Sequence, residues 1–257
     1  MQGNLAGFRI AILAADGFEQ SELIEPRNAL AAAGASIEIV SLRPGRIQGM
    51  KHKEKGDQID VTALVAEVTA AEFDGLVLPG GVSSPDEMRT HPEAVQFVAD
   101  FFRAGKPVDA ICHGPWMLVE ADVVEGRTLT SWPSLKTDLQ NAGADWVDRE
   151  VVLDDNLVTS RKPSNLQAFC EKLVMLIGAG REEDHDTDIE RLLSRDDLDQ
   201  ASKQRTLREW ERDARAVQRA ENEGMRSGLG GEEARIAEIR RAEKRLERMR
   251  GGHEKPH

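Results

Sequence analysis

Short apolar runs alternate with stretches of helical spacing along the first 180 residues. Five regions carry runs rich in β-branched residues, as buried strands do: Phe8–Ala14, Ser36–Ser41, Gly75–Leu78, Pro107–Ile111, and the pair Val151–Leu153 and Leu157–Thr159. An alternation of strand and helix patterns is typical of a parallel sheet with helices on both faces. We therefore predict one doubly wound, mostly parallel α/β sheet.

The segments between these runs carry helix or turn signals. Glu19–Ala33 is followed by Gly34, and Glu93–Ala104 is followed by Gly105, so both segments end as helices do. The segment Pro163–Ile177 begins with a proline, which suits a first helical turn. Residues 43–60 mix one proline and three glycines with polar residues, and they predict a hairpin or loop excursion.

Charge divides the chain into two parts. The sequence has 34 Lys and Arg residues against 46 Asp and Glu residues, a net charge of −12. Residues 1–180 hold 42 charged side chains with a net charge of −10, whereas residues 181–257 hold 38 among 77 residues with a net charge of −2. The first part has an ordinary globular composition, and the second is a polyampholyte. We predict a domain over residues 1–180 and a highly charged tail, helical or partly disordered, over residues 181–257.

The tail nevertheless has apolar residues at helical spacing. Two stripes with steps of three or four residues lie on either side of a break at residues 224–231: Leu207, Trp210, Ala214 and Val217, then Ile236, Ile239, Leu246 and Met249. They predict two or three charged helices that pack on the domain, on each other or on another subunit. The tail is either a solvated, partly disordered appendage or a segment that binds a partner or stabilises an oligomer.

Composition excludes several classes of protein. No stretch approaches 18 apolar residues, and the N-terminus lacks the basic region and cleavage site of a signal peptide, so no membrane span or export is expected. Two cysteines cannot form a disulfide framework, so we expect a cytoplasmic protein. The acidic balance argues against a nucleic-acid partner. No zinc-ligand spacing, phosphate loop or dinucleotide fingerprint is present, and we expect no metal and no cofactor.

The run that ends at Ile111 leads directly into Cys112, His113 and Gly114, and a helical pattern follows from Trp116. A strand, a sharp turn and a helix present a nucleophile above a sheet, and the positive end of the helix favours a thiolate. The alternative makes Cys112 a small core residue and His113 a surface residue. The strand-turn-helix context favours Cys112 as nucleophile, with His113 as base or cation.

Two other strand ends carry residues suited to the same site. Gly80 and Gly81 form either a plain turn or a pair of exposed N–H groups for an oxyanion. Glu19 is either a helix-start acid or a carboxyl that contacts the sulfur and moves a proton, which needs a pKa raised by burial. Asp86 and Glu87 follow Pro85 and look like acids that cap a helix start.

Five segments together resemble the PfpI family, in order and at the expected spacings between about Phe8 and Ile177. They are Asp16–Leu23, Leu76–Gly81, Ala110–Trp116, Leu129–Ser134, and Asn141–Ala144 with Trp146–Asp148. That family comprises intracellular cysteine peptidase-like proteins, many of them described as protein deglycases, in the superfamily of the parkinsonism-associated deglycase. The resemblance implies a flavodoxin-like fold of the class I glutamine amidotransferase type. It does not cover the tail.

The resemblance also implies roles for individual residues. Cys112 would be the nucleophile with His113 beside it, Glu19 would contact the sulfur, and the N–H groups of Gly81 and His113 would hold the oxyanion. An acid from an adjoining subunit completes a triad with the histidine in the family, and the matching position here is Asp86. The site would therefore lie at a subunit interface of a homodimer or hexamer.

This sequence departs from the family pattern at two positions. Asp86 is one methylene shorter than the glutamate of some members, which leaves the neighbouring Glu87 as a substitute. Asp109 stands where a small apolar residue is usual before Ala-Ile-Cys-His-Gly.

Four functions remain open on these residues. The first is a hydrolase that removes methylglyoxal or glyoxal adducts from proteins, and the second is a glyoxalase acting on the free dicarbonyls. The third is a cysteine peptidase that forms an acyl-thioenzyme. The fourth is a non-enzymatic redox or chaperone role in the stress response, with Cys112 oxidised. Class I glutamine amidotransferases activate their cysteine with a His and a Glu late in the domain. The next histidine after His113 is His185, in the tail, so a glutaminase is disfavoured.

Overall fold

The computed structural model describes residues 5–195, 198–223, 236, 239–244 and 246. The chain divides into two compact units, residues 1–180 and 181–257. The strands of the first unit are β1 (Arg9–Leu13), β2 (Phe18–Glu19), β3 (Ser36–Ser41), β4 (Arg46–Lys51), β5 (Glu54–Asp60), β6 (Ala63–Leu64), β7 (Gly75–Leu78), β8 (Val108–Ile111), β9 (Thr128–Leu129), β10 (Asp145–Trp146), β11 (Val151–Asp154) and β12 (Leu157–Ser160). The helices are α1 (Gln20–Ala32), α2 (Ser83–Met88), α3 (Pro92–Arg103), α4 (Pro115–Glu120), α5 (Lys136–Asn141), α6 (Leu166–Ser194) and α7 (Gln200–Glu223), with short 3-10 turns η1 (Ala70–Glu72), η2 (Pro133–Leu135) and η3 (Pro163–Asn165).

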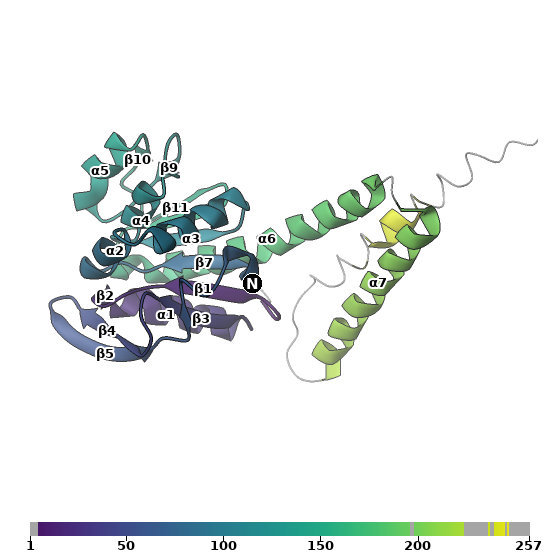
Figure 1. Cartoon of the computed structure of the whole chain (residues 1–257), viewed down its shortest axis with the longest axis horizontal. Helices are drawn as coiled ribbons and strands as arrows, with labels where there is room; N and C mark the ends of the chain where they lie inside the picture. The colour runs from purple at the N-terminus through teal and green to yellow at the C-terminus, as the bar shows by residue number, and fades with distance from the viewer. Residues whose placement is uncertain (1–4, 196–197, 224–235, 237–238, 245, 247–257) are drawn as a thin grey trace, which may run out of the picture. The chain divides into compact units, whose positions relative to one another are not determined.

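A seven-stranded sheet forms the centre of the first unit, in the order β11-β12-β8-β7-β1-β3-β6 (Figure 1). All neighbours in this sheet are parallel except the edge pair of β11 and β12. This arrangement confirms the predicted flavodoxin-like, mostly parallel sheet. The excursion over residues 43–60 is the antiparallel hairpin of β4 and β5, which joins β2 in a small second sheet.

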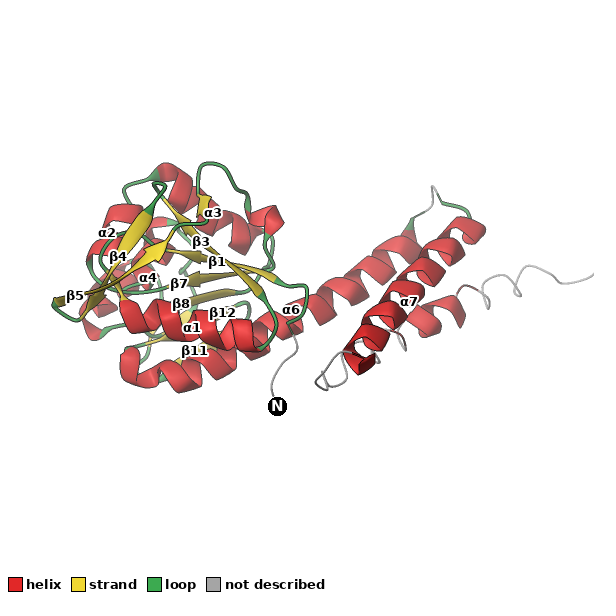
Figure 2. Ribbon diagram, turned by 90° about the horizontal axis from the view of Figure 1, so that it is seen from below, coloured by secondary structure: helices red, strands yellow, loops and turns green. Residues whose placement is uncertain are grey.

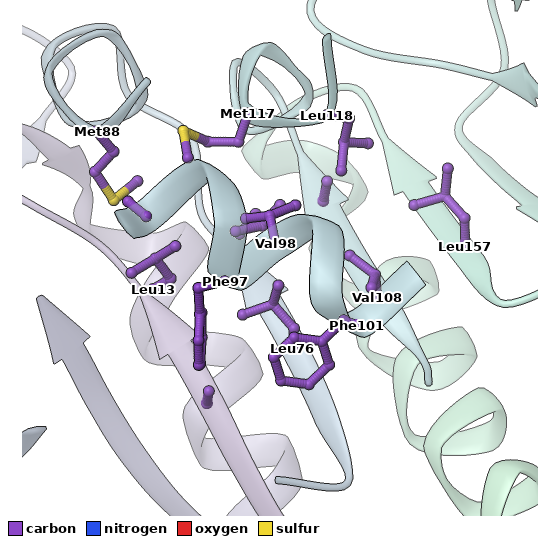
Figure 3. Packing of buried hydrophobic residues seen from close by; sticks show 14 of the residues in the cluster. Leu13, Leu76, Met88, Phe97, Val98, Phe101, Val108, Met117, Leu118 and Leu157 are labelled. Carbon is purple, nitrogen blue, oxygen red and sulfur yellow. The ribbon is translucent and has the colours of Figure 1, made fainter. Parts of the chain in front are cut away.

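Helices cover both faces of the sheet (Figure 2). Successive side chains of β1 point to opposite faces, so Ala11 and Leu13 lie in one core cluster and Ile10 and Ile12 lie in the other. The first cluster packs the sheet against α2, α3 and α4 (Figure 3). The second packs it against α1 and α6. The four-residue strands β7 and β8 are buried along their whole length, as expected for a sheet covered on both faces.

The second unit has a small apolar cluster of its own. It contains Ile189, Leu192, Leu207, Ile239, Ala242 and Leu246, all at most 7% exposed. The stripe residues of α7 therefore pack against the segment 239–246, which is one of the three arrangements expected from the sequence. Met249 and the break at residues 224–231 lie outside the described residues, as does the side chain of Val217. Among the described helices of the chain, none is long and apolar enough to cross a membrane.

Candidate active site

The carboxyl ends of three adjacent strands, β8, β7 and β1, meet at one edge of the sheet. Open parallel sheets form their sites at this edge. Each strand leads into one of the segments singled out in the sequence: β8 into Cys112, β7 into Gly80 and Gly81, and β1 toward the start of α1. The topology thus brings the three segments together.

Cys112 occupies the sharp turn between β8 and α4. Its φ of 60° lies in the left-handed region, a backbone conformation that costs a residue with a Cβ about 1–2 kcal/mol of conformational energy. Its side chain is only 6% exposed. The turn is fixed on both sides of the residue, because the Cys112 N–H donates to the Ser160 carbonyl at 2.9 Å and the Trp132 N–H donates to the Cys112 carbonyl at 2.9 Å. Cys112 is therefore held in a strained turn at the end of β8, the geometry expected of a nucleophile elbow.

Gly80 lies against three other residues of the site, Glu22, Cys112 and His113. A Cβ on this residue would lie 2.6 Å from the Cβ of Cys112 and 2.9 Å from the His113 nitrogen, and it would collide with Oε2 of Glu22. Gly81 has a φ of +86° and its backbone approaches Gly17 and Glu19, so a side chain is excluded there as well. These two glycines allow the backbone to come close to the sulfur. The N–H groups of Gly81 and His113 both donate to Cys112, at the positions predicted for the oxyanion donors.

The carboxyl beside the sulfur belongs to Glu22, and the expectation for Glu19 is wrong in this respect. Glu22 is fully buried, accepts a 3.0 Å hydrogen bond from the Gly80 N–H and interacts directly with the Cys112 thiol. Glu19 is the half-buried residue that precedes α1, and its carboxylate accepts a 3.0 Å hydrogen bond from the His52 N–H in the β4–β5 hairpin. Glu19 still has the extended backbone of β2 and pairs with β4, whereas Glu22 lies in the first turn of α1, and the two side chains therefore point in different directions.

Burial changes the proton affinity of this pair. Desolvation, reinforced by the charge of Glu19, raises the pKa of Glu22 from 4.5 to about 8. Burial, followed by the charge of Glu22, also raises the pKa of the Cys112 thiol, and the N–H groups of Gly81 and His113 oppose this change. The sequence-based expectation that a helix terminus would lower the thiol pKa is therefore wrong in its net direction. The two groups titrate as a couple, and a thiolate is favoured when its proton has moved to Glu22.

His113 is held in a defined orientation. Its Nδ1 lies 3.2 Å from the Cys112 sulfur, so the neighbours point toward one another, and its Nε2 lies 3.4 Å from the hydroxyl of Ser134. The ring of Trp132 stacks on the imidazole with centroids 6.0 Å apart, and Trp116 contacts it edge-on at 5.3 Å. Burial lowers the pKa of His113, so the imidazole is neutral at physiological pH.

The acids of α2 do not reach this site within the chain. Asp86 is exposed, and Glu87 forms an ion pair with Arg43. Neither is recorded in contact with His113 among the described residues. A role for Asp86 in an adjoining subunit stays a prediction.

Asp109 lies beneath the elbow, and it is the only titratable residue of β8. Its side chain has no exposed surface, and neither carboxylate oxygen has a hydrogen-bond partner among the described residues. The register places it between Val158 of β12 and Val77 of β7, and when ionised it would interact electrostatically with Cys170 on α6. Burial raises the pKa of Asp109 well above its ordinary value and so favours the neutral carboxyl. Within the described parts of the chain, no group of three His, Cys, Asp or Glu residues is arranged to hold a metal ion.

Comparison with known proteins agrees with this geometry. The model of the DJ-1/PfpI family matches residues 8–176. The chain belongs to the DJ-1/PfpI family. A deglycase of Pyrococcus abyssi is 45% identical over 169 residues, which are 66% of this chain and 99% of that protein. Protein/nucleic acid deglycase 2 of Escherichia coli is 44% identical over 172 residues, again 66% of this chain and 98% of that protein.

A solved structure is similar over almost the whole chain. It is a two-domain protein of Anabaena variabilis with DJ-1/ThiJ/PfpI-like and ferritin-like domains, and it matches 97% of this chain and 74% of its own with a TM-score of 0.60 and 27% identity. The matched region therefore extends beyond the family domain into residues 181–257. The curated relatives, in contrast, correspond to the family domain alone.

Sequence reasoning missed three members of the site. Glu22 stands inside the segment that carried the family resemblance, three residues after Glu19, but the choice between the two needs the direction of α1. Trp132 and Ser134 stand in another such segment, yet no local signal places η2 beside His113. Only the tertiary hydrogen bond between Trp132 and Cys112 brings that turn to the site.

Proposed function

We propose that residues 1–180 form a cysteine-dependent hydrolase that removes methylglyoxal and glyoxal adducts from protein side chains, with glyoxalase activity on the free dicarbonyls. The observation that carries this proposal is the couple of Cys112 and Glu22 at the edge of the sheet. The thiol supplies a nucleophile, and a buried carboxyl with a pKa of about 8 can take up and return a proton near neutral pH. The names of the relatives as deglycases support the same activity.

The chemistry balances with the residues present and one water. The hydroxyl of the adduct first expels the amine or thiol of the protein, which leaves with the hydroxyl proton, and this restores the aldehyde. The sulfur then adds to the aldehyde carbon as the thiol proton passes to Glu22 in its ionised form, and the N–H groups of Gly81 and His113 hold the developing oxyanion until Glu22 returns the proton to it. Glu22 then moves a proton from that carbon to the adjacent carbonyl carbon, so one carbon is oxidised and its neighbour reduced. Water hydrolyses the thioester to a hydroxy acid, and no external oxidant is needed.

Variants of the couple test the proposal. Cys112→Ala should lose turnover on a pre-formed methylglyoxal adduct of a peptide and on free methylglyoxal, while circular dichroism shows a folded domain. Glu22→Gln should lose turnover as well, because an amide cannot accept the proton. Glu19→Gln is the matched control one turn away and should retain most activity. Full activity of Cys112→Ala would refute the proposal.

The same variants separate the other candidate functions. Turnover of an unfolded protein chain without turnover of adducts would identify a peptidase. Protection of a client protein by both wild type and Cys112→Ala would identify a chaperone, and oxidation of Cys112 without turnover of any substrate would identify a redox sensor. We further propose a cytoplasmic location and a role in protection against dicarbonyl stress. A strain lacking the protein should then accumulate glycated cytoplasmic proteins when exposed to methylglyoxal.

We also propose that the protein forms a homo-oligomer with its sites at the subunit interfaces. We expect a homodimer or hexamer in which Asp86 of one subunit approaches the site of another. Asp86→Ala should reduce turnover if this contact exists, with Glu93→Ala, an exposed acid on α3, as the control. The oligomeric mass of the full chain, compared with that of a protein ending at Gly180, tests whether the tail contributes to assembly.

A further inference from the structure

Three tryptophans lie on the segments that follow β8 along the chain, and two of them are fully engaged by their own chain. Arg89 lies over the ring of Trp116 at 5.8 Å from the centroid, and Lys136 lies over the ring of Trp146 at 5.2 Å. The indole N–H groups of both also donate hydrogen bonds, at 2.9 and 3.0 Å. Each of these rings thus already pairs with a cation and with a hydrogen-bond acceptor.

Trp132, the third of them, differs from both. Its side chain is 38% exposed, and among the described residues no Lys or Arg lies over its ring and no acceptor bonds its indole N–H. The ring stacks on the imidazole of His113, with centroids 6.0 Å apart and an interplanar angle of 24°. That imidazole lies 3.2 Å from the sulfur of Cys112 through Nδ1. An exposed aromatic surface is therefore present beside the nucleophile.

We propose that Trp132 is a specificity-determining residue, whose indole binds the guanidinium group of an arginine adduct and so favours arginine adducts over those of cysteine and lysine. The inference rests on the proposed function, in which such adducts are the substrates. A guanidinium is planar, permanently charged and weakly hydrated, and it stacks on aromatic faces. Stacking on the ring is compatible with an acid of an adjoining subunit at the edge of His113.

The three kinds of adduct bring different charges to this ring. The hemithioacetal of a cysteine is neutral. The hemiaminal of a lysine, when protonated, carries a compact and strongly hydrated charge on one nitrogen. The adduct of an arginine keeps a delocalised, planar charge, and one nitrogen alone separates the guanidinium carbon from the carbon that becomes the aldehyde. When that carbon lies at the sulfur, the guanidinium is close enough to come within about 6 Å of the ring that stacks on the neighbouring imidazole.

The charges around the sulfur also suit a cationic substrate. Glu22 interacts with the Cys112 thiol, and the charge of Glu19 acts on Glu22. In the described part of the chain, no Lys or Arg forms a hydrogen bond or an ion pair with Glu22 or Cys112. An arginine adduct therefore meets acids and an aromatic ring, and no charge of its own sign.

Discrimination between adducts tests the inference in the full-length protein. The measured quantity is kcat/KM for a peptide with a methylglyoxal adduct on arginine, divided by kcat/KM for the same peptide with the adduct on cysteine. Trp132→Leu keeps apolar bulk without an aromatic face, and it should lower this ratio by about 2- to 30-fold. Trp132→Phe keeps an aromatic face without the N–H, and its loss should be smaller. Leu153→Ala is the control, because Leu153 on β11 is also an exposed apolar residue, and the ratio should not change.

A binding measurement tests the ring without any turnover. The chain has four tryptophans, so protein labelled with 5-fluorotryptophan gives four fluorine-19 signals, and the Trp132 signal is identified by its loss in Trp132→Phe. N-acetylarginine amide should shift this signal at lower concentration than N-acetylcitrulline amide, which has the same planar shape without the charge. N-acetyllysine amide, with a compact charge, should also be weaker than the arginine compound.

The outcomes separate this inference from the proposed function. An unchanged ratio in a folded Trp132→Leu, equal losses in Trp132→Leu and Trp132→Phe, or equal responses to the arginine and citrulline compounds would overturn the inference even if Cys112→Ala is inactive. A silent Trp132 signal together with a lower oligomeric mass of Trp132→Leu would assign the ring to a subunit contact and overturn it as well. An active Cys112→Ala variant would refute the hydrolase, while the fluorine titration still decides whether Trp132 binds the guanidinium.

Discussion

Replacing Glu22 with glutamine should stabilise the first unit at neutral pH while it abolishes turnover. Glutamine has the same shape, and its amide oxygen can still accept the hydrogen bond from the Gly80 N–H. The change removes only the ionisation of a fully buried carboxyl. Stability and activity should therefore move in opposite directions at one residue.

The size of the effect follows from the pKa of Glu22, which burial raises from 4.5 to about 8. Below pH 4 the carboxyl is protonated in the folded and the unfolded protein alike, and it costs nothing. Between about pH 4.5 and pH 8 the unfolded chain releases the proton while the folded domain keeps it, so stability falls as the pH rises. Each pH unit in that window costs about 1.4 kcal/mol, which gives about 3 kcal/mol at pH 7.

Thermal unfolding of the wild type and Glu22→Gln across this pH range measures the cost. A change of 3 kcal/mol corresponds to a rise in Tm of about 6–12 °C for a domain of this size. The difference between the two proteins should be near zero at pH 4, grow with pH and level off above pH 8. Glu19→Gln removes only the weaker, Coulombic contribution to the raised pKa of Glu22, so its difference from the wild type should grow much less with pH. A constant difference between the two proteins from pH 4 to pH 8 would refute the reasoning.

Four further measurements test other features. Gly80→Ala should fold poorly or lose all turnover, since its Cβ would meet Cys112 and Glu22; an active and stable variant would contradict the close approach. Asp109→Ala should raise the free energy of unfolding at pH 7 by about 1–3 kcal/mol, because it removes an unpartnered buried carboxyl, and the gain should vanish below pH 4; a loss at every pH would show that a partner exists. Alkylation of Cys112 should accelerate as the pH rises through about 8, where the couple releases its first proton, and a rate that falls over this range would exclude the couple. Leu207→Ala should lower the helix content measured by circular dichroism, since it opens the cluster of the second unit at a cost of about 2–5 kcal/mol, without changing turnover; unchanged helix content would contradict that cluster.

Local patterns were sufficient for the elements on which the fold depends. The predicted runs correspond to β1, β3, β7, β8, β11 and β12. The central parallel strands β7 and β8 are buried throughout and apolar over most of their length, which made them visible in the sequence. The elbow at Cys112 was also predictable, since a strand, a turn and a helix are each visible along the chain. The strands β9 and β10 have two residues each and leave no periodicity to detect.

The direction of side chains was harder to predict than their positions along the chain. Glu19 and Glu22 both follow the first strand, and the short pairing of β2 with β4 is what turns Glu19 toward the hairpin. That pairing joins residues far apart in sequence, so no local pattern reports it. The helix-dipole argument for the thiol failed for a related reason. It ignored the burial of the thiol and, after burial, the charge of Glu22, both of which arise only in the folded chain.

The donors that we propose for the oxyanion are main-chain N–H groups, those of Gly81 and His113, which hydrogen-bond Cys112. Side-chain substitutions at Gly81 and His113 therefore leave both N–H donors in place. Any loss of turnover that they cause reports the backbone geometry that Gly81 allows or the removal of the His113 imidazole. Chemical synthesis with an ester in place of the amide at residue 81 would delete one donor and keep every side chain. In the proposed mechanism, stabilisation of the transition state thus depends on the path of the backbone, and a substitution in the backbone itself is the direct way to measure it.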